Sequence, residues 1–236
     1  MSIHNLLKIT LREHNFDCKN NHYLILLAKY ISLISEWNKR INLISDTDVN
    51  KIIKRHILDS LYVMKLNIVS QCETILDIGS GAGFPGMIIN IYTNKDTTLI
   101  ESNSKKAFFL QLVKQRLGLK NLTVINKRAE DLSKSYVYRE KYDCIISRAL
   151  ANFPISMELS FPFSKINGNI IYFSTKKSNK IIEKYFNKIK IFGCEKYNLY
   201  PYVIDNVKYY LFCVKKLWKT PDKYPRSYNK MQKNTI

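Results

Sequence analysis

The chain has 236 residues, 46% hydrophobic and 12% aromatic, so it can bury a core and is not a disordered tail. Lysine and arginine number 38 against 19 acidic residues, a formal net charge of +19. Such an excess favours an acidic partner, first nucleic acid and second an anionic membrane, although a compositional bias toward lysine is an alternative explanation.

The first 68 residues predict a helical extension that stays outside any sheet. Apolar residues recur at three- and four-residue steps, the spacing of one helix face, at Leu24, Leu27, Ala28, Ile31 and Ile34. Asp46 or Thr47 is the expected N-cap of a later helix. The N-terminus lacks the layout of a signal peptide, and the apolar stretch 23–34 is broken by Lys29 and too short to span a bilayer. We expect a soluble cytoplasmic protein.

From residue 73 onward, short apolar runs alternate with helical patterns, which predicts a mainly parallel sheet with right-handed crossovers. Strands are predicted at 73–78, 97–101, 121–126, 141–147, 168–174 and 207–214, with a further one within 191–204. Helices are predicted at 84–92, 104–117, 152–160 and 177–189. The last two strands, joined near Asp205-Asn206, read as an antiparallel hairpin. The predicted fold class is α/β, a Rossmann-like seven-stranded domain over residues 69–218.

The cysteines are five in number, widely spaced, and form no Cys-x-x-Cys pair. Neither a metal site nor a disulfide framework is therefore predicted. Cys144 and Cys213 fall within apolar strands and are expected to be core thiols.

A glycine-rich turn follows the first predicted strand. Residues 77–86 read Asp-Ile-Gly-Ser-Gly-Ala-Gly-Phe-Pro-Gly, and such a turn seats a nucleotide-like cofactor at the end of a parallel strand. The pattern Asp-x-Gly-x-Gly-x-Gly, formed by Asp77, Gly79, Gly81 and Gly83, is typical of S-adenosylmethionine (SAM) methyltransferases. A dinucleotide fingerprint, counted from Gly79, would need glycine where Phe84 stands. A tight turn without a ligand is the alternative.

Two later strand ends carry candidate cofactor contacts. Glu101 lies about 20 residues after the turn, where a carboxylate can accept both ribose hydroxyls of an adenosine; the alternative is an acid at a helix N-terminus. After the third strand comes Arg128-Ala129-Glu130-Asp131, and the backbone of Ala129 and Glu130 could bind the adenine edge. A helix start is the alternative there, and both interpretations can hold together.

The fourth strand ends in Ser147-Arg148-Ala149-Leu150. A methyltransferase directed at an exocyclic amine would place Asn-Pro-Pro-Tyr here, and that tetrapeptide is absent, as is any Pro-Cys pair for attack on a pyrimidine carbon. A ring nitrogen with a free lone pair, such as guanine N7, is a simpler target because it needs no general base. Arg148 suits the N7/O6 edge or a phosphate. The alternative is a structural arginine paired with Asp77 or Glu130.

Three further features indicate function less specifically. His56 lies near Asp59 at helical spacing, which favours a structural or cofactor-lid role over catalysis. Several tyrosines could stack on bases, although half-buried packing is commoner on strands; they are Tyr197, Tyr200, Tyr202, Tyr209 and Tyr210. The tail is basic from Lys215, forms a segment of its own over 219–236, and is expected to be mobile from about Ser227.

Seven segments together carry a family resemblance: 37–43, 55–61, 76–86, 105–110, 128–130, 146–149 and 224–226. Their most specific parts are His-Ile-Leu-Asp-Ser-Leu, Gly-Phe-Pro-Gly and Ser-Arg-Ala. The chain resembles the small-subunit ribosomal RNA methyltransferase G family. Two segments depart from that family: 172–177 lacks its Leu-Lys-Gly and offers a shifted Lys176, and Ser-Tyr-Asn-Lys replaces Gly-x-Pro after Arg226.

The resemblance implies SAM-dependent methylation of guanine N7 in the decoding-region loop of 16S rRNA. It implies SAM contacts from Gly79, Phe84, Ala129, Glu130 and Arg148, and a catalytic pocket lined by Arg128 and Arg148. With the residue-level arguments, the expected cofactor site is Asp77, Gly79, Gly81, Gly83, Phe84, Glu101, Ala129, Glu130 and Arg148. The expected partner is 16S rRNA or the small ribosomal subunit, bound by a monomer without metal or membrane. A small-molecule methyltransferase and a non-catalytic RNA-binding protein are the alternatives.

Overall fold

A seven-stranded mixed sheet runs through the part of the chain that the computed structural model describes, residues 1–18 and 21–235 without the side chains of 176–178. The strand order is β3-β2-β1-β4-β5-β7-β6. The strands are β1 (Thr74–Ile78), β2 (Asp96–Ile100), β3 (Leu122–Ile125), β4 (Tyr142–Ser147), β5 (Ser164–Thr175), β6 (Tyr197–Ile204) and β7 (Val207–Lys215). Strands β1 to β5 are parallel, while β7 is antiparallel to both β5 and β6. The predicted α/β sheet with a final hairpin is confirmed.

The order of connection reverses at the centre of the sheet. From β1 the chain proceeds to β2 and β3 on one side, and then returns to place β4 on the other side of β1. Loops at the carboxyl ends of β1 and β4 therefore diverge and leave a crevice, which is where open α/β sheets bind ligands. The glycine turn follows β1 and Arg148 follows β4.

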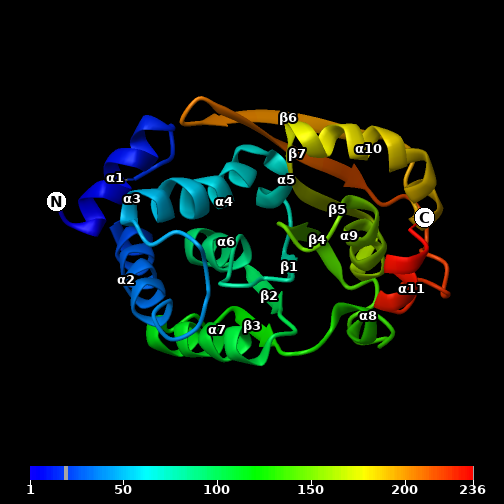
Figure 1. The fold of residues 1–236 in the computed structure, drawn as a ribbon, viewed down its shortest axis with the longest axis horizontal. Helices are drawn as coiled ribbons and strands as arrows, with labels where there is room; N and C mark the ends of the chain where they lie inside the picture. The colour runs from blue at the N-terminus through cyan, green and yellow to red at the C-terminus, as the bar shows by residue number, and fades with distance from the viewer. Residues whose placement is uncertain (19–20, 236) are drawn as a thin grey trace.

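Side chains alternate between the two faces of the sheet and belong to two separate apolar clusters. Ile75, Leu99 and Ile146 pack with helices α6 (Gly86–Thr93) and α7 (Ser104–Leu117) and with the N-terminal helices. Leu76 and Ile145 pack with the opposite layer. That layer contains α8 (Ala129–Leu132), α9 (Phe153–Ser160), α10 (Lys176–Ile189) and α11 (Tyr228–Lys233). In Figure 1 the two layers lie on the left and right of the sheet.

The N-terminal extension supplies much of the first layer. Its segments are α1 (Ile3–Glu13), α2 (Asn21–Trp37), α3 (Val49–Ile52), a π-helical segment (Ile53–Leu58), α4 (Asp59–Leu61), a 3₁₀ turn (Tyr62–Lys65) and α5 (Asn67–Ser70). Helix α2 contacts α6 and α7, and α4 contacts α6. The prediction of helices outside the sheet is confirmed. The division of the chain after residues 68 and 218 stays a prediction.

Two details of the extension differ from the prediction. Residues 38–48 are not helical, because the Asn38 side chain accepts hydrogen bonds from the N–H groups of Leu43 (2.8 Å) and Ile44 (3.0 Å) and so fixes a loop. The N-cap of α3 is Asp48, whose Oδ1 accepts from the N–H of Lys51 at 2.9 Å. Asp46 instead bonds the ring of His56.

The prediction of a mobile tail end is wrong. Residues from Tyr228 form helix α11, Met231 is fully buried, and Arg226 pairs with the buried carboxylate of Glu158. Lys216 does not belong to an exposed basic tail either, because its ammonium is buried and donates to Glu140 at 2.8 Å. Deleting 227–236 therefore removes a packed element and not a loose one.

Elsewhere the predicted elements agree with the structure. Helix α7 has the predicted bounds, and β5 begins four residues earlier than predicted, at Ser164. Cys144 and Cys213 are buried free thiols. No helix within the described residues is long and apolar enough to cross a membrane.

Candidate cofactor and catalytic site

The glycine turn folds back over the carboxyl end of β1. Gly79, Gly81 and Gly83 all have positive φ, at 71°, 57° and 102°, which explains why glycine stands at each. A Cβ on Gly83 would come within 2.9 Å of the Met87 side chain, whereas one on Gly81 would meet nothing nearer than 4.0 Å. The space over Gly81 is therefore open, and it is available to a ligand.

Asp77 lies at the end of β1 and is fully buried. Its Oδ2 accepts a hydrogen bond from the N–H of Gly86 at 2.9 Å, while its Oδ1 has no partner among the described residues. Burial raises the pKa of this carboxyl to about 7, although the Gly86 N–H lowers it in part. A buried oxygen without a hydrogen-bond donor is unfavourable, so a ligand that donates to Oδ1 would stabilise the site. A cationic donor would also favour the ionised form of the Asp77 carboxyl.

Glu101 comes directly after β2 and faces the glycine turn. One of its carboxylate oxygens accepts from the N–H of Gly81 at 2.8 Å, and the other accepts from the N–H of Asn103 at 2.7 Å. These two bonds hold the carboxylate in place. Each oxygen keeps further lone pairs, so the group can still accept a pair of ribose hydroxyls.

A cavity of about 130 Å³ extends from the turn toward the third strand end. It is lined by Ile78, Gly79, Ile100, Ser102, Lys127, Arg128, Ala129, Glu130, Leu150, Leu159 and Tyr228. Ala129 and Glu130 also begin helix α8, so the alternative prediction of a helix start is confirmed. The cavity is narrow and has a mixed polar and apolar lining. Apolar side chains such as Ile78, Ile100 and Leu150 suit the face of an aromatic ring, and the polar groups suit its edge.

Arg148 lies at the end of β4 and donates hydrogen bonds to the N-terminal extension. Its guanidinium bonds Oδ2 of Asp59 at 2.8 Å, the carbonyl of Arg55 at 3.1 Å, and Nδ1 of His56 at 3.0 Å. It also lies 5.3 Å from the ring centre of Phe84. Sequence reasoning proposed Asp77 or Glu130 as a structural partner, and that part of the prediction is wrong. The actual partners belong to a segment about 90 residues earlier.

His56 completes this cluster as a neutral ring. Nδ1 faces an arginine and can only accept, so Nε2 carries the proton and donates to Asp46 Oδ2 at 3.1 Å. Burial and the charge of Arg148 lower the pKa of His56. The imidazole stacks on Phe84 with ring centres 4.9 Å apart. This geometry supports the predicted structural role rather than a catalytic one.

Arg128 has a different environment. Its side chain is 60% exposed, and its guanidinium lies 3.7 Å from the Glu130 carboxylate. It lines the narrow cavity, whereas Arg148 lies against Phe84 and the extension. Of the two expected catalytic arginines, Arg128 is the one free to follow a substrate, and Arg148 is the one held in place.

Two contacts near the expected site residues could not be predicted from the sequence. Tyr202, on β6, donates to Asp59 Oδ1 at 2.5 Å and so fixes the carboxylate that pairs with Arg148. Tyr228, on α11, lines the narrow cavity. Both are distant in sequence from their neighbours, and no local pattern indicates them. The spacing of His56 and Asp59, three residues apart, did place that pair on one helix face.

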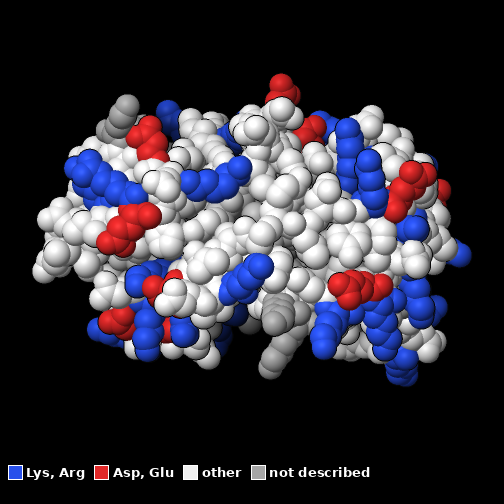
Figure 2. Space-filling view, turned by 90° about the horizontal axis from the view of Figure 1, so that it is seen from above, with Lys and Arg blue, Asp and Glu red and all other residues white. Residues whose placement is uncertain are grey.

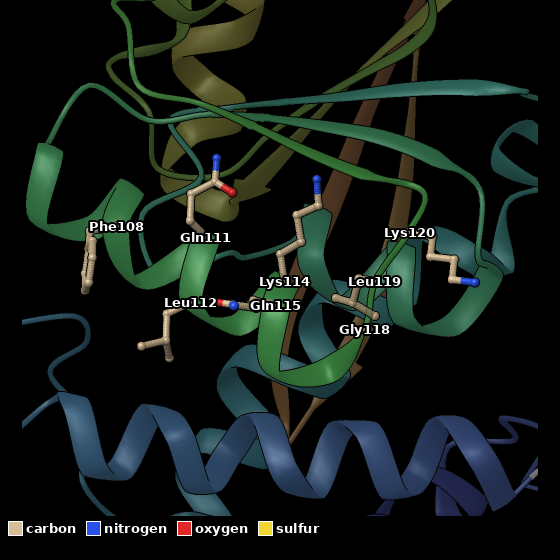
Figure 3. A pocket seen from close by; sticks show the side chains of 8 residues that line it. All are labelled: Phe108, Gln111, Leu112, Lys114, Gln115, Gly118, Leu119 and Lys120. Atoms are coloured by element: carbon tan, nitrogen blue, oxygen red, sulfur yellow. The ribbon is translucent and has the colours of Figure 1, made fainter.

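A larger hollow of about 540 Å³ lies on another surface. Figure 3 shows its lining residues along α7, above helix α2, and they include Phe108, Gln111 and Leu119. None of the expected site residues lines it. The expected site residues lie instead at the ends of β1, β2, β3 and β4.

These features fit SAM. The unpartnered Asp77 Oδ1 can accept from a cationic amino group, the open space over Gly81 admits a chain, Glu101 can hold a ribose, and the cavity beside Ala129 can hold a ring. Within the described residues no cluster of side chains could hold a metal ion. The fold and the site together define a SAM-dependent methyltransferase.

Comparison with known proteins identifies the methyltransferase family to which the chain belongs. Residues 24–203 match the family model "rRNA small subunit methyltransferase G". The chain is 33% identical to the ribosomal RNA small subunit methyltransferase G of Clostridium botulinum (strain Kyoto / Type A2), over the whole of both chains. The chain belongs to this methyltransferase G family, as its motifs indicated.

Solved structures show the same fold at low sequence identity. A putative O-methyltransferase from Klebsiella pneumoniae has a TM-score of 0.59 at 14% identity, covering 90% of this chain and 96% of its own. The TYW2 protein of M. jannaschii, solved in complex with AdoMet, has a TM-score of 0.52 at 17% identity, covering 66% and 75%.

Proposed function

We propose that the protein transfers a methyl group from SAM to guanine N7 in the decoding-region loop of 16S rRNA, and that it acts as a monomer. The observation that carries the choice of atom is the end of β4. There Ser147-Arg148-Ala149-Leu150 presents a fixed guanidinium and no side chain suited to take a proton. Guanine N7 has a free lone pair, so its methylation requires no proton transfer.

SAM, when bound, supplies a methyl group on a positively charged sulfur. Asp77 would hold the cationic amino group, Glu101 the ribose, and the backbone at Ala129 the adenine edge. Arg148 would meet guanine O6 or a phosphate with its remaining N–H groups, because three of its donors already bond the extension. The guanidinium does not approach N7 itself, since that atom becomes cationic. Catalysis then rests on alignment, which contributes up to about 7–11 kcal/mol in favourable cases.

The two alternatives are less well supported. A small-molecule methyltransferase would have little use for a net charge of +19. A non-catalytic RNA-binding protein would have no need of a buried carboxyl with an unpartnered oxygen beside an open glycine.

The test is a map of N7-methylguanine in ribosomal RNA from cells with and without the gene. We expect one 16S position to lose its methyl group and to regain it when purified protein and SAM are added to the undermethylated subunit or its RNA. A methyl group found on an exocyclic amine would contradict the proposal, and so would an unchanged 16S map.

A further inference from the structure

Tyr228 lines two neighbouring cavities, one of which adjoins the glycine turn. It lines the narrow cavity with Gly79 and Ala129, and it also lines a neighbouring cavity of about 330 Å³ with Asp131 and Lys134. The side chain comes from α11, at the far end of the chain from the rest of the site. One aromatic ring of the tail therefore forms a wall of the cavity assigned above to adenine.

The tail is fastened just before and just after this ring. Before it, the backbone N–H and the guanidinium of Arg226 donate to the buried carboxylate of Glu158, with bonds of 2.8 Å and 2.6 Å. After it, Met231 is fully buried in the cluster that contains Ala129. Arg139 fastens the preceding turn by donating to the carbonyls of Thr220 and Tyr224, both at 3.0 Å. The position of Tyr228 is thus set by the fold.

The packing of α11 on the rest of the domain is nevertheless only modestly stable. The helix has six residues, and Asn229, Lys230, Gln232 and Lys233 are exposed. A helix this short has little stability of its own. It depends on the burial of Met231 and on the Arg226 guanidinium, which donates to the carbonyl of Asn234 at 2.9 Å. A ligand that binds against Tyr228 would therefore change the docking of the whole helix.

We propose that Tyr228 binds the adenine ring of SAM and that helix α11 is a lid whose docking is coupled to cofactor binding. This rests on the proposed function in one respect, the assignment of the narrow cavity to adenine. Stacking of an aromatic side chain on a base changes affinity by about 5- to 100-fold. The ring, and not the hydroxyl, supplies this interaction, because the face of an aromatic ring binds any base.

The first experiment measures the binding of SAM and of its demethylated product, S-adenosylhomocysteine, to the full chain by calorimetry. We expect Tyr228→Ala to weaken both ligands by about tenfold or more, and Tyr228→Phe to bind them as the unaltered protein does. Gln232→Ala, an exposed change on the same helix, is the matched control and should have no effect. Met231→Ala, which loosens the helix without changing the cavity wall, should also weaken both ligands.

The outcomes separate the lid from the proposed function. If the unaltered protein does not bind SAM, the cofactor assignment itself fails. If it binds SAM and Tyr228→Ala binds equally well, the lid is wrong while the proposed function stands. If Tyr228→Ala weakens RNA binding but not the binding of S-adenosylhomocysteine, the ring serves the RNA and the inference is overturned.

A second experiment detects the coupling directly. Hydrogen exchange of the α11 amides should slow on addition of S-adenosylhomocysteine in the unaltered protein, and should slow far less in Tyr228→Ala. Exchange that is unchanged by the ligand in the unaltered protein would contradict a lid.

Discussion

Asp77 is the buried group with the clearest dependence on pH. Its pKa is about 7 in the folded protein because of burial, well above the ordinary value of an aspartate. A raised carboxyl pKa contributes stability that is fully present below the unfolded pKa of about 4 and is lost as the pH rises through 7. The unaltered protein should therefore lose roughly 2–4 kcal/mol of unfolding free energy between pH 4 and pH 8 from this group.

Asp77→Asn removes that titration. Urea unfolding at several pH values should show Asp77→Asn gaining stability relative to the unaltered protein as the pH rises, and SAM affinity should fall because the amide is uncharged. Asp96→Asn, an exposed change at the start of β2, is the control and should leave the pH slope unaltered. Parallel pH profiles for the unaltered protein and Asp77→Asn would contradict the account.

Arg148 and Asp59 are coupled. Arg148→Ala leaves the Asp59 carboxylate, which is only 12% exposed, without its cation. We expect a loss of about 2–4 kcal/mol, part of which Asp59→Asn should restore in the double variant, because the unpaired charge is then gone. Arg128→Ala should cost less than about 0.5 kcal/mol, since its side chain is mostly exposed. Chemical denaturation of the unaltered protein, Arg148→Ala, Asp59→Asn, the double variant and Arg128→Ala measures this, and strictly additive losses for Arg148 and Asp59 would show that the pair is not coupled.

The same variants separate folding from chemistry. At a temperature where all remain folded, Arg148→Ala and Arg128→Ala should both slow methyl transfer more than they weaken RNA binding. With SAM saturating, turnover by the unaltered protein should be nearly flat from pH 6 to pH 8, because no proton is moved and His56 is held neutral. A bell-shaped profile at saturating SAM would point to a general base.

At the scale of elements, two of the glycines in the glycine turn have different roles. Gly81 has positive φ but open space around a Cβ, whereas a Cβ on Gly86 would lie 2.6 Å from the Cβ of Asp77. Gly81→Ala should cost only about 1–2 kcal/mol of stability yet strongly weaken SAM binding. Gly86→Ala should unfold the protein at a clearly lower temperature. Thermal melts with calorimetry distinguish the two, and equal SAM binding by Gly81→Ala would show that the open space is not used.

The glycine turn could be predicted because its residues are neighbours in the sequence. Pairs of residues that are distant in the sequence could not be predicted. The acid, the three glycines and the apolar strand before them are contiguous in 74–86. Each strand and helix of the alternating pattern is likewise a continuous stretch of sequence. The Tyr202–Asp59 bond joins residues 143 apart, and Arg226–Glu158 joins residues 68 apart. Nothing in the neighbourhood of either residue shows which partner it will find. The tail looked mobile because one buried methionine is a weak signal in sequence.

At the scale of the whole molecule, the positive charge does not form one continuous patch on the face shown in Figure 2. There Lys and Arg lie in several groups at both ends, acidic side chains lie among them, and the middle is largely uncharged. RNA binding should therefore combine many separate phosphate interactions and weaken steeply with salt, because each of them releases counterions.

A plot of log affinity against log salt measures this. Alanine at three exposed tail residues, Lys223, Lys230 and Lys233, should reduce the slope by about one for each phosphate that is no longer neutralised. Lys65→Ala, on the extension, is the control. Lys216 is unsuitable because it is buried on Glu140. An RNA affinity that ignores salt would rule out the electrostatic account.

The bonds between the extension and the β6–β7 hairpin also fix an order of events in synthesis. Lys54 pairs with Asp205, 151 residues later, and Tyr62 donates to the carbonyl of Val203, 141 residues later. At about 5–20 residues per second, the extension waits roughly 8–30 s after its own translation for these partners. Of the two partners of Asp59, Arg148 follows it by 89 residues and Tyr202 by 143, so the carboxylate lacks both in the first part of that wait and lacks Tyr202 for most of the rest. The segment made first can therefore settle only after the hairpin has been made, and a chain released before β7 would leave its oldest helices unfinished.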